Sequence, residues 1–262
     1  MSPSLPVRFE STPSGGYVPV LANSALVDGA VASQTAGSTN PGLYYQVGGQ
    51  GLNGAFAAAL ADAGQLEAAN AELVRAYDAI YGGGAWRLDG SGPSPRRDRL
   101  TTVLVNLRPD GRAIGDQVRV LAYSVGPVLD RRGIVDHRQY QDIYHDALSR
   151  LAAERTSPAR LVDAIRLTML SCGIYGGLVD DRTALYRAAA HNIIVAAARA
   201  LADHPRLDGL TLLVNANDQD RDGRAQPTPT ERSAFTAAAT GLGLAVDEAG
   251  FVIDPSVAAA GP

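Results

Sequence analysis

Hydrophobic and polar positions follow two different periods along this chain. In five stretches, apolar residues recur every three to four positions, which is the period of a helix with one buried face. These predicted helices cover residues 51–63, 65–81, 138–155, 181–202 and 230–240. In the third helix, we expect one apolar stripe to face the core, made of Tyr140, Ile143, Tyr144, Ala147, Leu148 and Leu151.

Short runs rich in β-branched and other apolar residues separate the helices and predict strands. These runs cover residues 17–22, 101–107, 117–125, 161–170 and 210–214, with two short final strands at 242–246 and 251–253. Pro19 allows the first run only an edge or end position, and the fourth run is also compatible with a helix. The alternation of strands and helices indicates an α/β fold.

The distribution of Ser, Pro and Gly suggests where the domain begins and ends. Residues 1–16 are rich in these three residue types and are expected to be flexible. One domain is expected over residues 17–254, followed by a C-terminal tail at 255–262.

Composition and charge exclude several classes of protein. The 262 residues are 46% hydrophobic, as in ordinary globular proteins, and no apolar run reaches the roughly eighteen residues of a membrane-spanning helix. A net charge of −4 lacks the basic footprint of a nucleic-acid-binding protein. The first residues show no basic start followed by an apolar core, so we expect a soluble cytoplasmic protein without a Sec signal peptide.

All 23 basic side chains are arginine, and the chain has no lysine. GC-rich coding is the first explanation, because Ala, Gly, Asp and Pro are also frequent. A chain without side-chain amines also offers no side-chain acceptor for ubiquitin-type conjugation. That property would suit a bacterial effector translocated into a foreign cell, and this remains the second interpretation.

A glycine-rich segment, VGGQGLNGAF at residues 47–56, opens the first predicted helix. Glycines let the backbone approach a ligand, and the N–H groups of a helix N-terminus favour a phosphate. Residues 49–54 also match G-x-G-x-x-G. However, the second strand and the acidic residue of a Rossmann unit do not follow. A glycine turn that packs a helix on the sheet is the alternative.

A second glycine segment, SCGIYGG at residues 171–177, lies between a predicted strand and the helix at 181–202. Two such segments in one α/β domain suggest a diphosphate held between them. Cys172 is the only cysteine, and no histidine lies near it in the sequence. We therefore expect it to be a buried, unreactive residue rather than a nucleophile.

The candidate metal ligands do not predict a metal site. The four histidines have no metal-binding spacing; they are His137, His145, His191 and His204. Residues 218–223 match the first half of a calcium loop, D-x-D-x-D-G, but Pro229 stands where that loop needs a bidentate glutamate. A solvated acidic loop is therefore expected.

Four motifs, taken in order, resemble the macro domain, the ADP-ribose-binding α/β/α fold. Residues 22–24, ANS, are similar to the family's NAAN-S signature, and residues 48–55, GGQGLNGA, to its GGGVDGA loop. Residues 125–127, VGP, are similar to its hTVGP strand end, and residues 171–176, SCGIYG, to its GTGIYG loop. The resemblance extends from about residue 17 to residue 217.

This resemblance implies a three-layer α/β/α sandwich around a mixed sheet, with insertions at about 28–45 and 65–100 in its first half. It also implies that Asn23 contacts the distal ribose, that Tyr175 forms a wall beside it, and that Glu10 is placed for the adenine amino group. The backbones of the two glycine loops would hold the diphosphate, and the end of the strand at 210–214 would border the adenine. The other implied ligand-binding residues are Gly48, Gly49, Gly51, Asn53, Ser171, Gly173, Ile174, Gly176, Asn215 and Asn217.

The chain departs from the family pattern at Asn53, where the GGGVDGA loop has an acid. An amide cannot act as a base, so hydrolysis would need another carboxylate. Asp180 and Asp181 are the first candidates to serve with Asn53, because they precede the helix after the second glycine loop. Asp28 is the next candidate. The alternatives are helix capping for the aspartate pair and a loop turn for Asp28.

The leading functional hypothesis is an ADP-ribosyl hydrolase that removes ADP-ribose from modified protein side chains, with arginine as the candidate linkage. It would need no cofactor, and its partner would be ADP-ribose or an ADP-ribosylated protein. The alternative is a non-catalytic reader of ADP-ribose. A third hypothesis is a nucleotide-dependent transferase or oxidoreductase with a convergent phosphate site.

Overall fold

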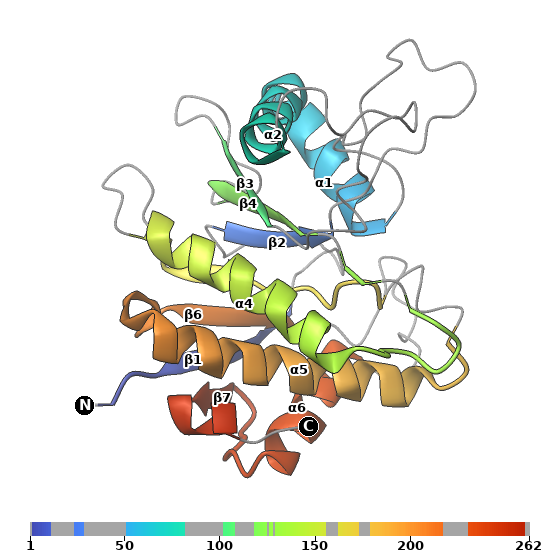
Figure 1. Cartoon of the computed structure of the whole chain (residues 1–262), viewed down its shortest axis with the longest axis vertical. Coiled ribbons are helices and arrows are strands. Elements are labelled where there is room, and N and C mark those ends of the chain that lie inside the picture. The colour runs from blue at the N-terminus through green and yellow to red at the C-terminus, as the bar shows by residue number, and fades with distance from the viewer. Residues whose placement is uncertain are drawn as a thin grey trace.

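A seven-stranded mixed sheet forms the centre of the protein in a computed structural model (Figure 1), with strand order β3-β4-β2-β5-β6-β1-β7. The strands are β1 (Leu5–Glu10), β2 (Ser24–Asp28), β3 (Val103–Asn106), β4 (Val120–Ser124), β5 (Ala164–Arg166), β6 (Thr211–Asn215) and β7 (Gly250–Ile253). The five inner strands are mutually parallel, whereas β3 and β7 pair antiparallel at the two edges. The structure describes residues 2–11, 24–28, 51–81, 102–107, 118–124, 126–127, 129–155, 162–172, 179–216 and 230–259.

Helices cover both faces of the sheet (Figure 1). They are α1 (Gly51–Asp62), α2 (Leu66–Tyr81), α4 (His137–Glu154), α5 (Arg182–Asp203) and α6 (Glu231–Gly241). Strand β4 shows the layering, because Val120 and Ala122 belong to the core formed with α4, α5 and α6. Leu121 and Tyr123 belong to a second core formed with α1 and α2. The predicted three-layer α/β/α sandwich is therefore confirmed.

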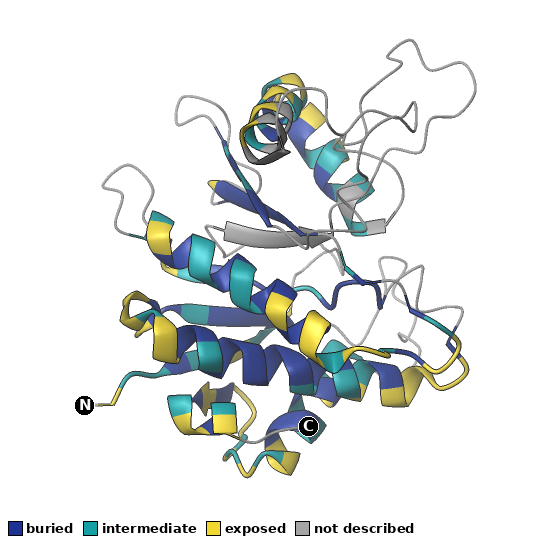
Figure 2. Ribbon diagram, in the orientation of Figure 1, coloured by how far each residue is buried: buried dark blue, intermediate teal, exposed yellow. Residues whose placement is uncertain are grey.

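The helices form where their periodicity predicted them, and side chains define three of their starts. Asp136, Asp181 and Thr230 are the N-cap residues of α4, α5 and α6, and each accepts a hydrogen bond from a backbone N–H three residues on. All six residues of the predicted apolar stripe in α4 are buried (Figure 2). None of the helices in the described ranges is long and apolar enough to cross a bilayer.

The two ends of the chain are more ordered than their composition predicted. Residues 5–10 form β1 between β6 and β7, because Leu5 and Val7 alternate into the core and outweigh Pro6. The expected tail includes a 3-10 helix, Pro255–Ala259, which buries Val257 against the core. Of the two predicted final strands, only the second forms, as β7, while Val246 makes one isolated bridge to it.

Two further strand predictions need correction or lie outside the described residues. The run at 161–170 forms only the three-residue β5, after which residues 167–172 leave the sheet as a loop. The run at 17–22 lies outside the described residues. The sequence reading missed β2, a short strand that pairs with β4 and β5 near the middle of the sheet.

Candidate functional site

The candidate site lies along the carboxyl edge of the parallel strands. Because these strands share one direction, their last residues meet at one edge, where open α/β sheets bind their ligands. Glu10 and Asn215 are in register at the ends of β1 and β6. Asp28 and Ser124 are in register at the ends of β2 and β4. Two acids and two polar residues thus lie on this edge.

The end of β4 packs directly against the start of the second glycine segment. Ser171 Oγ donates a hydrogen bond of 2.9 Å to the carbonyl of Pro127. A Cβ atom added at Gly126 would lie 2.2 Å from Ser171 Oγ and 3.2 Å from its backbone nitrogen. Ser171 adopts a φ of 64°, in the left-handed region that favours glycine. Gly126 and Pro127 of the VGP motif and Ser171 of the SCGIYG motif therefore form one tightly packed corner.

Two tyrosines of α4 contact the residues on either side of Ser171 and so support this corner. Tyr140 Oη donates to the carbonyl of Leu170 at 2.9 Å and lies 3.8 Å from Cys172 Sγ. Tyr144 Oη accepts from the Leu170 N–H at 2.7 Å and donates to the carbonyl of Thr168 at 2.5 Å. Burial, with Cys172 and Tyr144 close by, raises the pKa of Tyr140 well above its ordinary value, so its hydroxyl remains a neutral donor. The sequence reading assigned both tyrosines to the core stripe and missed this role.

A buried charge lies beside the same edge. Arg166, the last residue of β5, is only 5% exposed. Burial lowers the pKa of its guanidinium, while the carboxylates of Glu231 and Glu10 act in the opposite direction. Glu231 opens α6 at this edge, and its carboxyl group is hydrogen-bonded to the backbone of Asn215. The sequence reading missed Arg166 and Glu231, although a single arginine inside the apolar run AIRLTML was a usable signal.

The carboxyl group of Glu231 keeps its proton at a higher pH than an ordinary carboxyl group does, because its pKa is raised. Although part of the residue is exposed, its carboxyl is surrounded by protein, and this desolvation raises its pKa to about 7. The Arg166 charge and the Asn215 hydrogen bond partly offset that rise. A carboxyl group that titrates near neutral pH at the edge of a sheet is typical of a functional position.

The predicted catalytic acids occupy solvent-exposed positions. Asp181 is the N-cap of α5, and its side chain accepts a hydrogen bond of 2.9 Å from the N–H of Ala184. The backbone N–H of Asp180 donates to the carbonyl of Arg131 at 3.0 Å. The capping alternative therefore describes the observed contact of Asp181. Asp28 instead ends β2 at the carboxyl edge.

The ligand-binding predictions fall partly inside the described residues. Gly51 begins α1 and Asn53 lies in its first turn, but the Asn53 side chain is outside what the structure describes. Ser171 packs against Pro127, and Asn215 ends β6 at the carboxyl edge; their roles in ligand binding stay predictions. Eight predicted residues lie outside the described ranges: Asn23, Gly48, Gly49, Gly173, Ile174, Tyr175, Gly176 and Asn217.

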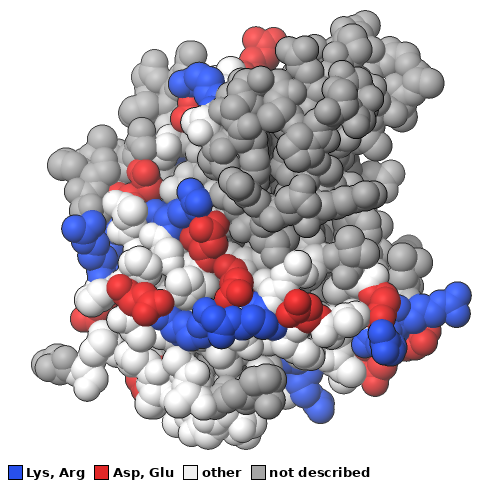
Figure 3. All heavy atoms as spheres, in the orientation of Figure 1, with Lys and Arg blue, Asp and Glu red and all other residues white. Residues whose placement is uncertain are grey.

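Charged side chains alternate in sign over α4 and α5 (Figure 3). Arg199 and Arg138 both pair with Asp142, and His145 Nε2 lies 2.9 Å from a carboxylate oxygen of Asp203.

Within the described ranges, no group of three or more His, Cys, Asp or Glu side chains could hold a metal ion.

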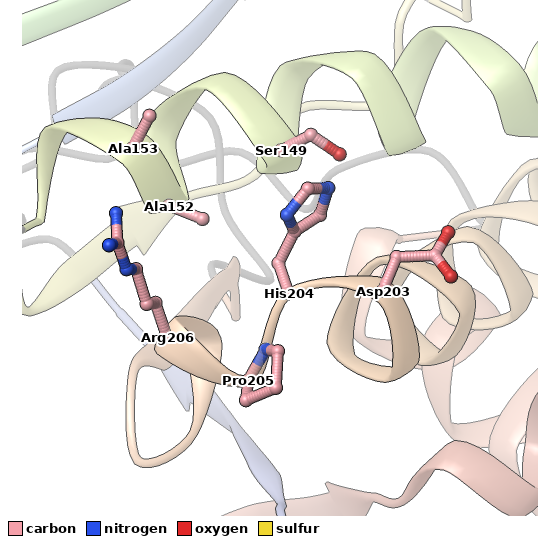
Figure 4. Close-up of a pocket in the computed structure, with 7 residues that line it drawn as sticks. All are labelled: Ser149, Ala152, Ala153, Asp203, His204, Pro205 and Arg206. Carbon is pink, nitrogen blue, oxygen red and sulfur yellow. The ribbon is translucent and has the colours of Figure 1, made fainter.

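A shallow pocket of about 280 Å³ lies at the other end of these helices (Figure 4). The last turns of α4 and the end of α5 form it, with Ser149, Asp203, His204 and Arg206 among its lining residues. Since α4 and α5 begin beside the carboxyl edge and end away from it, this pocket is separate from that edge.

Comparison with solved structures identifies the fold. The Oceanobacillus iheyensis macrodomain with MES bound is similar to this chain with a TM-score of 0.50 and 14% identity, over 88% of this chain and 89% of that one. A mutant of that macrodomain with ADPR gives a TM-score of 0.46 and 15% identity, over 85% and 87%. The Trypanosoma brucei macrodomain gives 0.46 and 14%, over 89% and 66%. No family model and no curated protein matches the sequence. The first comparison shows that the chain has the macrodomain fold.

Proposed function

We propose that this protein binds ADP-ribose along the carboxyl edge of its sheet. The observation that carries the proposal is the packed corner of Gly126, Pro127 and Ser171, because two motifs that resemble the macro domain meet there within the macrodomain fold. A fold alone does not determine a ligand, so the two motifs, and not the fold, point to ADP-ribose.

The first glycine segment also favours a bound phosphate. Helix α1 begins at Gly51, inside this segment, after Gly48 and Gly49. The first turn of a helix presents unpaired N–H groups and a positive potential, which suit a phosphate. The second glycine segment begins at the corner held by α4. A diphosphate between the two segments would receive backbone donors from both.

Hydrolysis of an ADP-ribosyl bond is the second candidate function, and Asp28 is the observation that favours it. Asp28 is the last residue of β2, in register with Ser124, at the edge where the ligand is proposed to bind. Asp181 is less free for proton transfer, because its carboxylate accepts the capping hydrogen bond of α5. Without a suitably placed acid, the protein would act as a reader of ADP-ribose.

Calorimetry with ADP-ribose tests the first proposal. We expect micromolar affinity, equivalent to about 8 kcal/mol, and weaker binding of AMP, which lacks the second phosphate and the distal ribose. Gly173→Glu should abolish binding by placing a bulky acid in the second glycine segment. Gly241→Glu is the matched control, because a Cβ there meets no atom within 4 Å. No heat from the folded wild type would refute the proposal.

Turnover assays separate the enzyme from the reader. Proteins carrying ADP-ribose on Arg, Glu or Ser would be incubated with the wild type, Asp28→Asn, Asp180→Ala and Asp181→Ala. A hydrolase should lose about 100-fold or more in turnover in one of these variants while still binding ADP-ribose. If the wild type binds ADP-ribose but releases none from any linkage, the protein is a reader.

A further inference from the structure

A buried arginine occupies a strand position where an apolar side chain would pack. On either side of it, Ile165 and Leu167 face the core beneath α4 and α5. Arg166 points to the opposite face of the sheet, in the same register row as Leu213 of β6. Burying a guanidinium is unfavourable unless other charges compensate it, so its neighbours are informative.

Two carboxylates from different elements provide that compensation. Glu10 ends β1 and Glu231 begins α6, and the charge of each raises the pKa of Arg166. Both lie beside Asn215, since Glu10 pairs with it in register and Glu231 is hydrogen-bonded to its backbone. Strands β1, β5 and β6 and helix α6 therefore bring one arginine and two acids together at the carboxyl edge.

The arginine is buried, whereas the two acids are partly exposed. Arg166 is 5% exposed, so it is sealed beneath the edge. Glu10 and Glu231 are each partly exposed, so they lie between the buried guanidinium and the surface. The two acids are therefore nearer to a ligand at the edge than the arginine is, and the arginine can act on that ligand only through them.

We propose that Arg166 is a positioning residue, which holds Glu231 and Glu10 at the carboxyl edge so that Glu231 accepts a hydrogen bond from bound ADP-ribose. This inference rests on the proposed function and adds a residue pair to it. It assigns to β5 and α6 a role that the four motifs do not contain.

The protonation of Glu231 makes the proposal measurable. The groups that act on it, among the described residues, are Arg166 from β5, the Asn215 backbone from β6 and Tyr186 from α5; Glu10 in turn interacts with the charge of Arg166. Burial raises the pKa of Tyr186, so its hydroxyl stays neutral. With a pKa of about 7, Glu231 gains its charge between pH 6 and pH 8. A ligand that donates to the carboxylate must therefore bind more tightly as the pH rises.

Calorimetric titration of the full chain with ADP-ribose at pH 6, 7 and 8 tests this prediction. The diphosphate of ADP-ribose does not titrate in this range. We expect wild-type affinity to rise about tenfold, the usual scale for a hydrogen bond to a charged group. Glu231→Gln should flatten the profile, while Glu248→Gln, at an exposed glutamate, should leave it unchanged.

The arginine variants separate positioning from a merely structural role. Arg166→Lys keeps the positive charge and should keep the wild-type profile. Arg166→Leu removes the charge that lowers the pKa of Glu231, so the midpoint of the profile should move to higher pH. If Arg166→Leu does not fold, Arg166→Lys and Glu231→Gln are compared instead. Only Glu231→Gln should lose the pH dependence of ADP-ribose affinity.

The outcomes distinguish the two proposals. A wild type that binds ADP-ribose with the same affinity at pH 6 and pH 8 overturns the role of Glu231 and leaves the proposed function standing. A pH dependence that persists in Glu231→Gln belongs to another group, such as a histidine, and also overturns it. A folded wild type that binds no ADP-ribose at any of these pH values overturns the proposed function itself.

Discussion

Replacing Gly126 by alanine tests whether the corner between the VGP and SCGIYG motifs supports the binding site. The added Cβ would lie 2.2 Å from Ser171 Oγ and 3.1 Å from the Cβ of Leu170. The first distance forces Ser171 to rotate or the segment to move, and the second requires Leu170 to shift by a few tenths of an ångström. Rotation would break the hydrogen bond from Ser171 Oγ to the Pro127 carbonyl.

The expected magnitude follows from the two losses. Overpacking costs about 1–3 kcal/mol, and a buried carbonyl left unpaired costs about 1–3 kcal/mol. Since the segment can relax partly, we expect Gly126→Ala to destabilise the protein by about 2–3 kcal/mol. We also expect at least a tenfold loss in ADP-ribose affinity, because the displaced residue leads directly into the second glycine loop. Urea unfolding and calorimetry measure the two effects.

The double variant Gly126→Ala, Ser171→Gly identifies the cause. Glycine at residue 171 removes the colliding Oγ and suits a φ of 64°, so the double variant should recover about half of the lost stability. Gly241→Ala is the control and should change stability by less than about 1 kcal/mol, because its Cβ meets nothing within 4 Å. If the effects of the single variants Gly126→Ala and Ser171→Gly on stability add up to that of the double variant within about 0.5 kcal/mol, the two residues are not coupled and the reasoning is wrong.

Three further predictions concern described side chains. Tyr144→Phe should destabilise more than Tyr140→Phe, by about 2–4 against about 1–2 kcal/mol in urea unfolding, because the Tyr144 hydroxyl serves two backbone groups. Asp181→Ala should cost about 1 kcal/mol as a lost N-cap, whereas the exposed Asp180→Ala should stay within about 0.5 kcal/mol. Folded Glu231 keeps its proton to about pH 7, but the unfolded chain releases it near the ordinary glutamate pKa of about 4.3. The free energy of unfolding should therefore fall as the pH rises between these values, and Glu231→Gln should flatten that slope.

Periodicity predicted the helices well because each one buries a continuous stripe. The spacing of Tyr140, Ile143 and Tyr144 requires one helical face, and all three are buried in α4. Short strands were harder to predict, because β5 has only three residues and its apolar context continues into a loop. Strand β2 was missed because SALVD carries too few apolar positions to show a period.

Residues of the candidate site could be predicted only where they belong to a motif of consecutive residues. The resemblance led to Ser171 and to the glycine beside Pro127, since both belong to contiguous motifs. Arg166 and Glu231 are 65 residues apart in the sequence, and they come together through the parallel pairing of β5 with β6 and the start of α6 beside Asn215. No local sequence pattern predicts that two such distant residues interact. An arginine inside an apolar run that predicts a buried strand is nevertheless unusual, and it marks a candidate functional residue.

The position of Arg166 is better explained by ligand binding than by stability. Replacing a buried ion pair with apolar residues of similar volume is often neutral or stabilising. At this position the strand already supplies Ile165 and Leu167 to the core, so packing alone does not require a charge. The charge also lies at the carboxyl edge, beside the acids that face the surface, where parallel sheets bind ligands. If Arg166→Leu unfolds at the same urea concentration as the wild type yet binds ADP-ribose more weakly at pH 7, the arginine serves the site rather than the fold.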